Sequence, residues 1–439
     1  MAPKWVDEIP GLPVRVVSRR LVKASDPSVE PHVTAFSNLD LVSDEQLSMT
    51  CVYPRPSSGD FNAVVEAFEA RLPSFLNLFF HLAGRIVRNP SSGLPELLCY
   101  NQGAELVVGY AVVELESLNW ASTDQSLMKI PLPYAKEAPL SVQLLSFTCG
   151  GFAVVWGTHH LIGDGYYGAM LVRMGSEVAP TQVQDRSVLF RPRNPPSYSA
   201  AVAEMFTRWD HRHELRETAS TDGQRATRVQ AMSAYLWKAL AGIRCRMLWW
   251  VDGRQRVSSP ELRSALRSYA GNVMSYALAD SDADTVLSEP LANVAAMVRE
   301  AITRRNYDEM YQELVDWVDV QKKPTRLIET PTVGLGSPTV AQTMMSSFPI
   351  DANFGFGQAA LVMPVELSFG RLCASVLSIC ARPGDAGSWI VNAYIWPSLA
   401  AALESDEQRV FKPITAEYLG LTLSGGNHEP GEGEARPRL

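Results

Sequence analysis

Residues 152–158 read Phe-Ala-Val-Val-Trp-Gly-Thr, and they constrain the fold more than any other stretch of the chain. A strand at a surface alternates apolar and polar residues, whereas here both alternating sets are apolar. Such a strand belongs in the centre of a sheet that is covered on both faces. Gly150-Gly151 before it predicts a turn, and Leu140 to Thr148 predicts a neighbouring strand. We therefore expect a covered sheet at this point of the chain.

Periodicity predicts further elements on both sides of this strand pair. Val14–Val17 and Met49–Tyr53 alternate as strands do, and 54–58 has the composition of a turn. Asp60 to Leu76 carries apolar residues at helical spacing, with Asp60 as its N-cap. Two more helices are predicted, at Tyr166–Glu177 and at Thr227–Ile243.

A chain of 439 residues is too long for one ordinary core and favours two domains of roughly 200 residues each. The stretch from Ala179 to Tyr198 is polar and rich in proline, which is typical of an exposed linker. We predict an N-terminal lobe over 1–178, a crossover linker over 179–222 and a C-terminal lobe over 223–424. Residues 425–439 are poor in hydrophobic side chains, and we expect them to fray.

The charge and the apolar pattern narrow the choice of partners and compartment. A formal net charge of −8 argues against nucleic acid, because phosphate binding needs a basic face. No apolar run approaches the ~18 residues that span a bilayer, and the first residues lack the apolar core of a signal peptide. We expect a cytoplasmic monomer whose cysteines are thiols rather than a disulfide framework: Cys51, Cys99, Cys149, Cys245, Cys373 and Cys380.

The central strand leads directly into His159-His160-Leu161-Ile162-Gly163-Asp164-Gly165. A histidine in a loop after a rigid strand is well placed for chemistry, because imidazole exchanges protons near neutral pH. The carboxylate of Asp164 can hold the local backbone or orient the ring, and the two glycines disfavour a regular helix here. Two other interpretations stay open from the residues alone. The histidines can be satisfied polar groups at a strand end, or His160 and Asp164 can share a metal ion.

Other catalytic patterns fit the chain less well. It contains no Gly-x-Ser-x-Gly nucleophile elbow and no Walker A loop. Gly355 to Ala360 matches G-x-G-x-x-A, but the residues that follow read as an extended segment containing Pro364. A dinucleotide-binding loop would have to open a helix at this point, so we exclude that site.

Two separated motifs resemble the signatures of the BAHD family of plant acyltransferases, which are HxxxD-G in mid-chain and DFGWG nearer the C-terminus. The first corresponds to 160–165 and the second to Asn353-Phe354-Gly355-Phe356-Gly357. Shorter echoes of the family occur along most of the chain, at 82–85, 149–152, 190–193, 251–254 and 271–272. A short motif alone recurs by chance, but both motifs in order, with these echoes, favour the acyltransferase interpretation of His160.

The resemblance implies an α/β protein with a two-lobed, chloramphenicol-acetyltransferase-like fold, each lobe a mixed sheet with flanking helices and a channel between them. It implies transfer of an aromatic, hydroxycinnamoyl or short aliphatic acyl group from acyl-CoA to a hydroxyl or amine of a small specialised metabolite. His160 would act as general base in a ternary complex, without an acyl-enzyme. Asp164 is the second catalytic position, chiefly structural in the family, and Gly163 and Gly165 would shape the loop. Acyl-CoA is a co-substrate, so we expect no bound cofactor and no metal.

The chain departs from the second signature at two positions. Asn353 stands where the family has Asp, and Phe356 where it has Trp. In the family that Asp is thought to pair with an arginine of the second lobe, for which Arg254 is the candidate here. These changes leave open a homologue that binds acyl-CoA or a partner without catalysis. A third alternative is a condensation-type domain acting on a carrier-bound thioester, since those domains share HHxxxDG.

Overall fold

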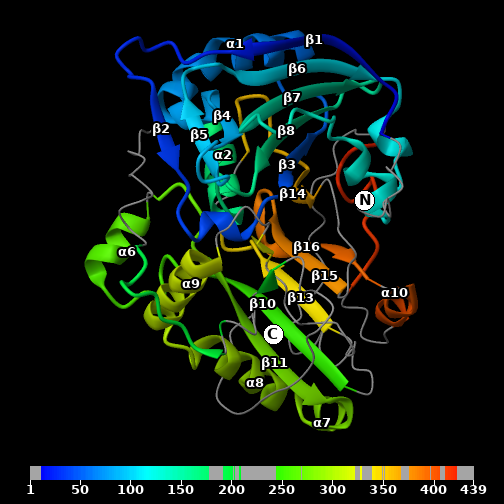
Figure 1. Ribbon diagram of the computed structural model, residues 1–439. Coiled ribbons are helices and arrows are strands. Elements are labelled where there is room, and N and C mark those ends of the chain that lie inside the picture. Colours follow the sequence, from blue (N-terminus) through cyan, green and yellow to red (C-terminus); the bar gives the residue numbers. More distant parts are fainter. Residues whose placement is uncertain are drawn as a thin grey trace, which may run out of the picture.

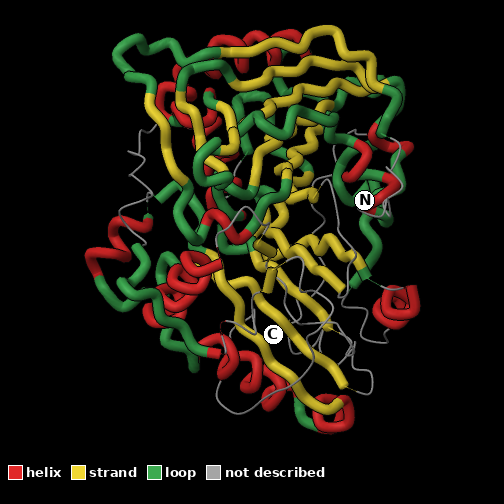
Figure 2. Tube along the Cα trace, in the orientation of Figure 1, coloured by secondary structure: helices red, strands yellow, loops and turns green. Residues whose placement is uncertain are grey.

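The computed structural model describes residues 11–176, 191–200, 202, 207–208, 244–267, 269–321, 327–328, 339–348, 350, 352–366, 375–395, 397–405 and 411–422. Within these ranges two mixed β-sheets carry most of the core (Figure 1). Figure 2 shows the strands of the first sheet above those of the second in this view. The predicted α/β class with two mixed sheets is therefore confirmed.

The first sheet has six strands and contains the predicted central strand. In spatial order its strands are β1 (Val14–Val22), β6 (Ala104–Ala111), β7 (Leu140–Phe147), β8 (Phe152–His159), β3 (Gln46–Tyr53) and β14 (Leu361–Glu366). Every residue of β7 and β8 is buried, as expected for β8, whose two faces are both apolar. Strand β7 also buries the polar side chains of Ser141 and Gln143. Only β6 and β7 run parallel, so the sheet is mixed.

Helices α1 (Phe61–Leu78) and α2 (Gly165–Ser176) lie against this sheet, and Asp60 caps α1 by accepting from the Ala63 amide, as predicted. A layer of aromatic rings joins α1 to β8, with Phe68 and Phe75 beside Trp156. Shorter elements complete this part of the protein: β2 (His32–Ala35), β4 (Arg85–Arg88), β5 (Pro95–Cys99), η1 (Asp40–Val42), η2 (Phe80–Ala83), η3 (Leu115–Ser117), η4 (Thr123–Gln125) and η5 (Leu127–Lys129).

The second sheet has five strands, in the order β11 (Met274–Asp282), β10 (Arg244–Asp252), β13 (Thr339–Met344), β15 (Ser375–Arg382) and β16 (Asp385–Tyr394). Its two inner pairs are parallel and its two outer pairs antiparallel. Around it lie α6 (Pro260–Leu266), α7 (Ala283–Ser288), α8 (Leu291–Thr303), α9 (Tyr307–Gln321) and α10 (Pro397–Glu404). A two-residue ladder joins β9 (Thr207–Arg208) to β12 (Leu327–Ile328).

One strand from the C-terminal part of the chain joins the first sheet, which a simple division of the sequence does not capture. Strand β14 falls within the range predicted as the C-terminal lobe, yet it pairs with β3 at the edge of the first sheet. Pro364 is tolerated there, because an edge strand can do without one amide donor. Most of the predicted linker, the predicted helix at 227–243 and the tail at 425–439 lie outside the described residues. The lobe boundaries therefore stay predictions. Among the helices in the described ranges, none is long and apolar enough to cross a bilayer.

Candidate active site

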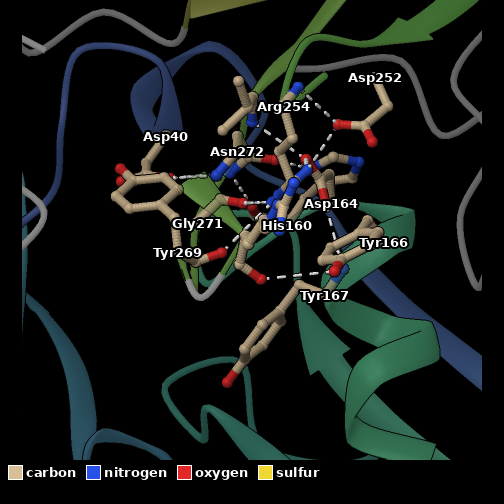
Figure 3. A network of polar contacts seen from close by, with 12 residues as sticks. Asp40, His160, Asp164, Tyr166, Tyr167, Asp252, Arg254, Tyr269, Gly271 and Asn272 are labelled. Carbon is tan, nitrogen blue, oxygen red and sulfur yellow. Dashed lines mark hydrogen bonds and ion pairs between the residues drawn. The ribbon is translucent and has the colours of Figure 1, made fainter. Parts of the chain in front are cut away.

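His160 directly follows β8, and its amide donates to the carbonyl of Glu45 at 2.7 Å. Its side chain is partly exposed, whereas its neighbours Leu161 and Ile162 are buried. The Nδ1 atom lies 3.0 Å from Oδ1 of Asn272, which begins the approach to β11 (Figure 3). With Nδ1 engaged, Nε2 is the ring nitrogen left to meet a substrate.

The adjacent His159 has a different environment. It is 5% exposed, and its Nδ1 accepts from the Leu161 amide at 3.2 Å. Its Nε2 lies 3.4 Å from Oδ1 of Asp44. Since a nitrogen that accepts a hydrogen bond carries no proton, Nε2 is the protonated nitrogen of neutral His159. Both ring nitrogens of His159 are thus occupied in holding the turn, and His160 is the histidine available for chemistry.

The carboxylate of Asp164 holds the backbone on two sides of the site. Its Oδ1 accepts from the Tyr167 amide at 3.1 Å, which caps the start of α2. Its Oδ2 accepts from the Val273 amide at 2.9 Å and from Nη1 of Arg254 at 2.8 Å. Burial opposes ionisation, but Arg254 and these amides outweigh it and lower the pKa of Asp164. These contacts indicate that Asp164 positions the backbone around the site. Its carboxylate faces Arg254 and does not face His160, as a metal ion shared between the two would require.

Arg254 lies beside Asp164 and not beside the second motif, so the predicted pairing with the loop at Asn353 is wrong. Its side chain is 2% exposed, and its Nη1 also donates to Asp252 at 2.9 Å. Its Nη2 donates to the carbonyl of Gly271 at 2.7 Å, and its guanidinium lies 4.5 Å from the ring centre of Tyr166. Burial disfavours the cation, yet the two carboxylates outweigh that effect and raise the pKa of Arg254.

The loop-shaping glycines differ in what surrounds them. A Cβ atom on Gly163 would lie 2.5 Å from the ring of Tyr167, which is fully buried and hydrogen-bonded to His81. A Cβ atom on Gly165 would lie 3.3 Å from the end of the Met345 side chain. The loop from His160 to Asp164 is not helical, as the glycines predicted. Helix α2 begins at Gly165, one residue before the predicted Tyr166, where Asp164 supplies the cap.

The second motif is a tight loop that packs on the first sheet. The exposed Asn353 accepts from the Gly355 amide at 2.9 Å, which replaces any ion pair by a local turn contact. Gly355 and Gly357 have φ values of +93° and +111°, a region that side chains rarely adopt. The buried ring of Phe354 lies 5.0 Å from that of Phe68 on α1.

This loop lies at the opposite end of β3 from His160. It leads into β14, whose first residue pairs with Val52, whereas His159 pairs with Gln46. The six residue steps from Val52 to Gln46 span roughly 20 Å at about 3.4 Å per residue. A pocket beside the loop, partly lined by Phe356 and Trp156, has a cavity volume of only ≈ 20 Å³. That space suits about one water molecule and no substrate. The changes at Asn353 and Phe356 are thus far from the candidate base.

Two site residues were missed by sequence reasoning. Asn272 appeared only as part of a short family echo, and Asp40 carried no signal at all. Asn272 lies 112 residues after His160 in the sequence, and Asp40, which contacts Asn272, lies 232 residues before Asn272. Only the packing of the two parts brings these three side chains together (Figure 3).

Solved structures share this arrangement of two mixed sheets with flanking helices. The chain is similar to TRI101 of F. graminearum complexed with ethyl coenzyme A, with a TM-score of 0.69, 14% identity and coverage of 86% of this chain and 98% of that one. It is similar to vinorine synthase with a TM-score of 0.59 and 19% identity, covering 93% and 98% of the two chains. At these identities the likeness establishes the fold.

The chain belongs to the Transferase family, whose model matches residues 12–211 and 205–409. This is the BAHD family of acyl-CoA-dependent acyltransferases of specialised metabolites, so the resemblance stated from the two motifs is confirmed. Anthranilate N-benzoyltransferase protein 1 of Dianthus caryophyllus is 24% identical, over 80% of this chain and 89% of that protein. Agmatine hydroxycinnamoyltransferase 1 of Oryza sativa subsp. japonica is 25% identical, over 85% and 94%. Fatty alcohol:caffeoyl-CoA acyltransferase of Arabidopsis thaliana is 25% identical, over 72% and 81%.

Proposed function

We propose that this protein transfers an acyl group from acyl-CoA to a hydroxyl or amine of a small specialised metabolite, with His160 as the general base. The observation that carries the proposal is the environment of the ring. Nδ1 of His160 faces Asn272 at 3.0 Å, and among the described residues no hydrogen-bond partner occupies Nε2. A partly exposed, oriented nitrogen of this kind is what general-base chemistry requires.

The proposed reaction needs one proton shuttle and no acyl-enzyme. Nε2 takes the proton from the acceptor hydroxyl or amine as its oxygen or nitrogen bonds to the thioester carbonyl carbon. The tetrahedral oxyanion collapses, the carbon–sulfur bond breaks, and the imidazolium returns the proton to the CoA sulfur. The products are the ester or amide and free CoA. Both substrates are present together, so the kinetics should follow a ternary-complex pattern.

The choice of substrates rests on the relatives. Their names include benzoyl, hydroxycinnamoyl and caffeoyl-CoA transfer, which supports an aromatic acyl donor for this chain. The same names cover both N-transfer and a fatty alcohol as acceptor, so both acceptor classes belong in the test. Our preferred pair is an aromatic acyl-CoA with a hydroxylated acceptor.

The test measures CoA release with a panel of aromatic and short aliphatic acyl-CoAs and with hydroxylated and amine acceptors. His160→Ala should lower kcat by roughly 10²–10⁴-fold, the range that general acid–base catalysis contributes. The matched control is His32→Ala, at an exposed histidine on β2, which should stay within about twofold of wild type. Equal acceptor-dependent CoA release by wild type and His160→Ala would refute the proposal. Tight acyl-CoA binding without turnover on any acceptor would instead favour a non-catalytic homologue.

A further inference from the structure

We propose that Asn272, held in place by Asp40, is the positioning residue that keeps the proton on Nδ1 of His160 and so leaves Nε2 as the base. This inference rests on the proposed function, because it concerns how the same histidine is prepared for proton transfer. Asn272 and Asp40 contact no reacting atom in the proposal. They act through His160 alone.

The neighbours of the Asn272 side chain fix the orientation of its amide. Its Nδ2 lies 2.7 Å from the carbonyl oxygen of His160 and 3.0 Å from Oδ1 of Asp40. Both of these neighbours only accept hydrogen bonds, so the atom between them must be the NH₂ group. The amide oxygen therefore faces the ring, at 3.0 Å from Nδ1 of His160. An oxygen there accepts a proton from Nδ1, and neutral His160 then has its lone pair on Nε2.

Asp40 prevents the Asn272 amide from turning over. Asp40 is fully buried, and its Oδ1 accepts from the Asn272 backbone amide at 2.8 Å as well as from Nδ2. Its Oδ2 accepts from the amide and the hydroxyl of Ser37, at 3.0 and 2.8 Å. A flipped Asn272 would set its oxygen against this carboxylate and leave buried hydrogen-bonding groups unpaired, which disfavours the flip.

The motif residue Asp164 helps to hold the backbone that carries Asn272. Its Oδ2 accepts from the amide of Val273, and its partner Arg254 donates to the carbonyl of Gly271. These two contacts hold the backbone on either side of Asn272. The ion pair at 2.8 Å between Asp164 and Arg254 thus fixes the segment from which the amide reaches His160 (Figure 3). Asp164 acts on the base through Asn272.

The experiment uses the full-length protein in two variants, each with a matched control. Asn272→Ala removes the acceptor of the Nδ1 proton. Asp40→Asn is isosteric but can offer an NH₂ group to Asn272, which allows the amide to flip. The control for the first is Asn77→Ala, where an amide oxygen accepts from the backbone amides of Ser25 and Asp26. The control for the second is Asp316→Asn, where a buried carboxylate accepts from the amides of Arg193 and Ser197.

The first readout is the tautomer of His160, from ¹⁵N spectra of protein labelled at histidine, with His160→Gln used to assign the signal. Wild type should carry the proton on Nδ1 when neutral, and both test variants should shift toward the Nε2–H form. The second readout is steady-state kinetics. Both test variants should lose roughly 10²–10⁴-fold in kcat, the scale found when a base is misplaced or in the wrong tautomer, with KM for acyl-CoA within about twofold. Both controls should keep kcat within about twofold.

The outcomes separate the two proposals. An Nε2–H signal in wild type, or an unchanged tautomer and kcat in Asn272→Ala, would overturn the inference. A wild-type Nδ1–H signal together with no acyl transfer to any acceptor would sink the proposed function and leave the positioning contact standing. Thermal unfolding of all four variants shows whether each is folded, and Asn272→Ala, which changes no charge, decides the matter if Asp40→Asn does not fold.

Discussion

At the scale of single residues, Arg254 is shared unequally between two carboxylates. Asp164 is 4% exposed and its pKa is lowered, because Arg254 and two backbone amides outweigh the effect of burial. The side chain of Asp252 is 26% exposed, and burial together with the nearby charge of Asp164 raises its pKa. Asp164 is therefore the carboxylate that compensates the buried guanidinium, and Asp252 is a second, less favoured partner.

Replacing these two carboxylates separately should give unequal losses of stability. Asp164→Asn weakens the cap of α2 and leaves Arg254 short of its main counter-charge, which costs about 3–5 kcal/mol for a broken buried pair. Asp252→Asn keeps an oxygen for the Arg254 amide, which lies 3.2 Å from Oδ1, and should cost less than about 1 kcal/mol. Urea unfolding of both variants measures the difference. Equal losses would contradict the unequal sharing.

How far the site could be predicted depends on sequence distance. His160 was accessible to prediction, because the strand before it and the glycines after it are adjacent in the chain. Asn272 and Asp40 were not, because nothing local marks a side chain whose partner lies more than a hundred residues away. Arg254 was assigned to the wrong partner for the same reason. A motif places a charge in the sequence, but only packing decides which opposite charge it meets.

At the scale of elements, the unit β8–loop–α2 was predictable in outline from periodicity alone. The start of α2 at Gly165 was not, since the helix propensity of glycine argues against it and the Asp164 cap decides. The sequence also did not predict which sheet β14 joins. Its sequence reads as an extended segment, but an extended segment does not reveal which sheet it joins.

The two glycines of this unit should respond differently to the same small substitution. In Gly163→Ala the new methyl group would meet the Tyr167 ring at 2.5 Å, and this buried ring cannot move freely because it also bonds to His81. We expect a loss of about 1–3 kcal/mol, as for other overpacked sites. In Gly165→Ala the methyl group would meet the flexible end of Met345 at 3.3 Å, and alanine favours the helix. The change should stay within about 1 kcal/mol. Thermal unfolding compares them, and a loss in Gly165→Ala as large as that in Gly163→Ala would refute the packing argument.

At the scale of the whole molecule, buried carboxylates tie together segments that are distant in the sequence. Asp40 meets Asn272, and Asp164 meets Arg254. On α9, Asp316 accepts from the amide of Arg193 at 2.7 Å, from its side chain, and from the amide of Ser197 at 3.0 Å. These contacts hold residues 191–199, which lie within the predicted linker, against α9. These buried carboxylates therefore join segments that lie far apart in the chain.

The lowered pKa values of two buried carboxylates make the stability of the protein depend on pH. Burial alone would raise the pKa of Asp316, but hydrogen bonds from Ser197 and Arg193 outweigh it and lower the pKa, as Arg254 does for Asp164. An Asp pKa is about 3.9 in an unfolded chain. A carboxyl group whose pKa is lower in the folded protein than in the unfolded chain stabilises the fold fully at pH values above the unfolded-state pKa. This stabilisation is lost as pH falls through the folded-state pKa.

Urea unfolding midpoints should accordingly hold from about pH 7 to 5 and fall below about pH 4. The raised pKa of Asp252 has the opposite effect on stability. Its contribution to the free energy of unfolding declines as pH rises above the ordinary Asp pKa. Asp252 therefore offsets part of the loss of stability at low pH. Asp316→Asn removes one of the titrating groups, so its midpoint should start lower at pH 7 and fall less steeply below pH 4 than that of wild type. If the urea midpoints of the two proteins fall equally steeply below pH 4, Asp316 does not have a lowered pKa in the folded state. The contact between residues 191–199 and α9 then does not depend on the charge of Asp316.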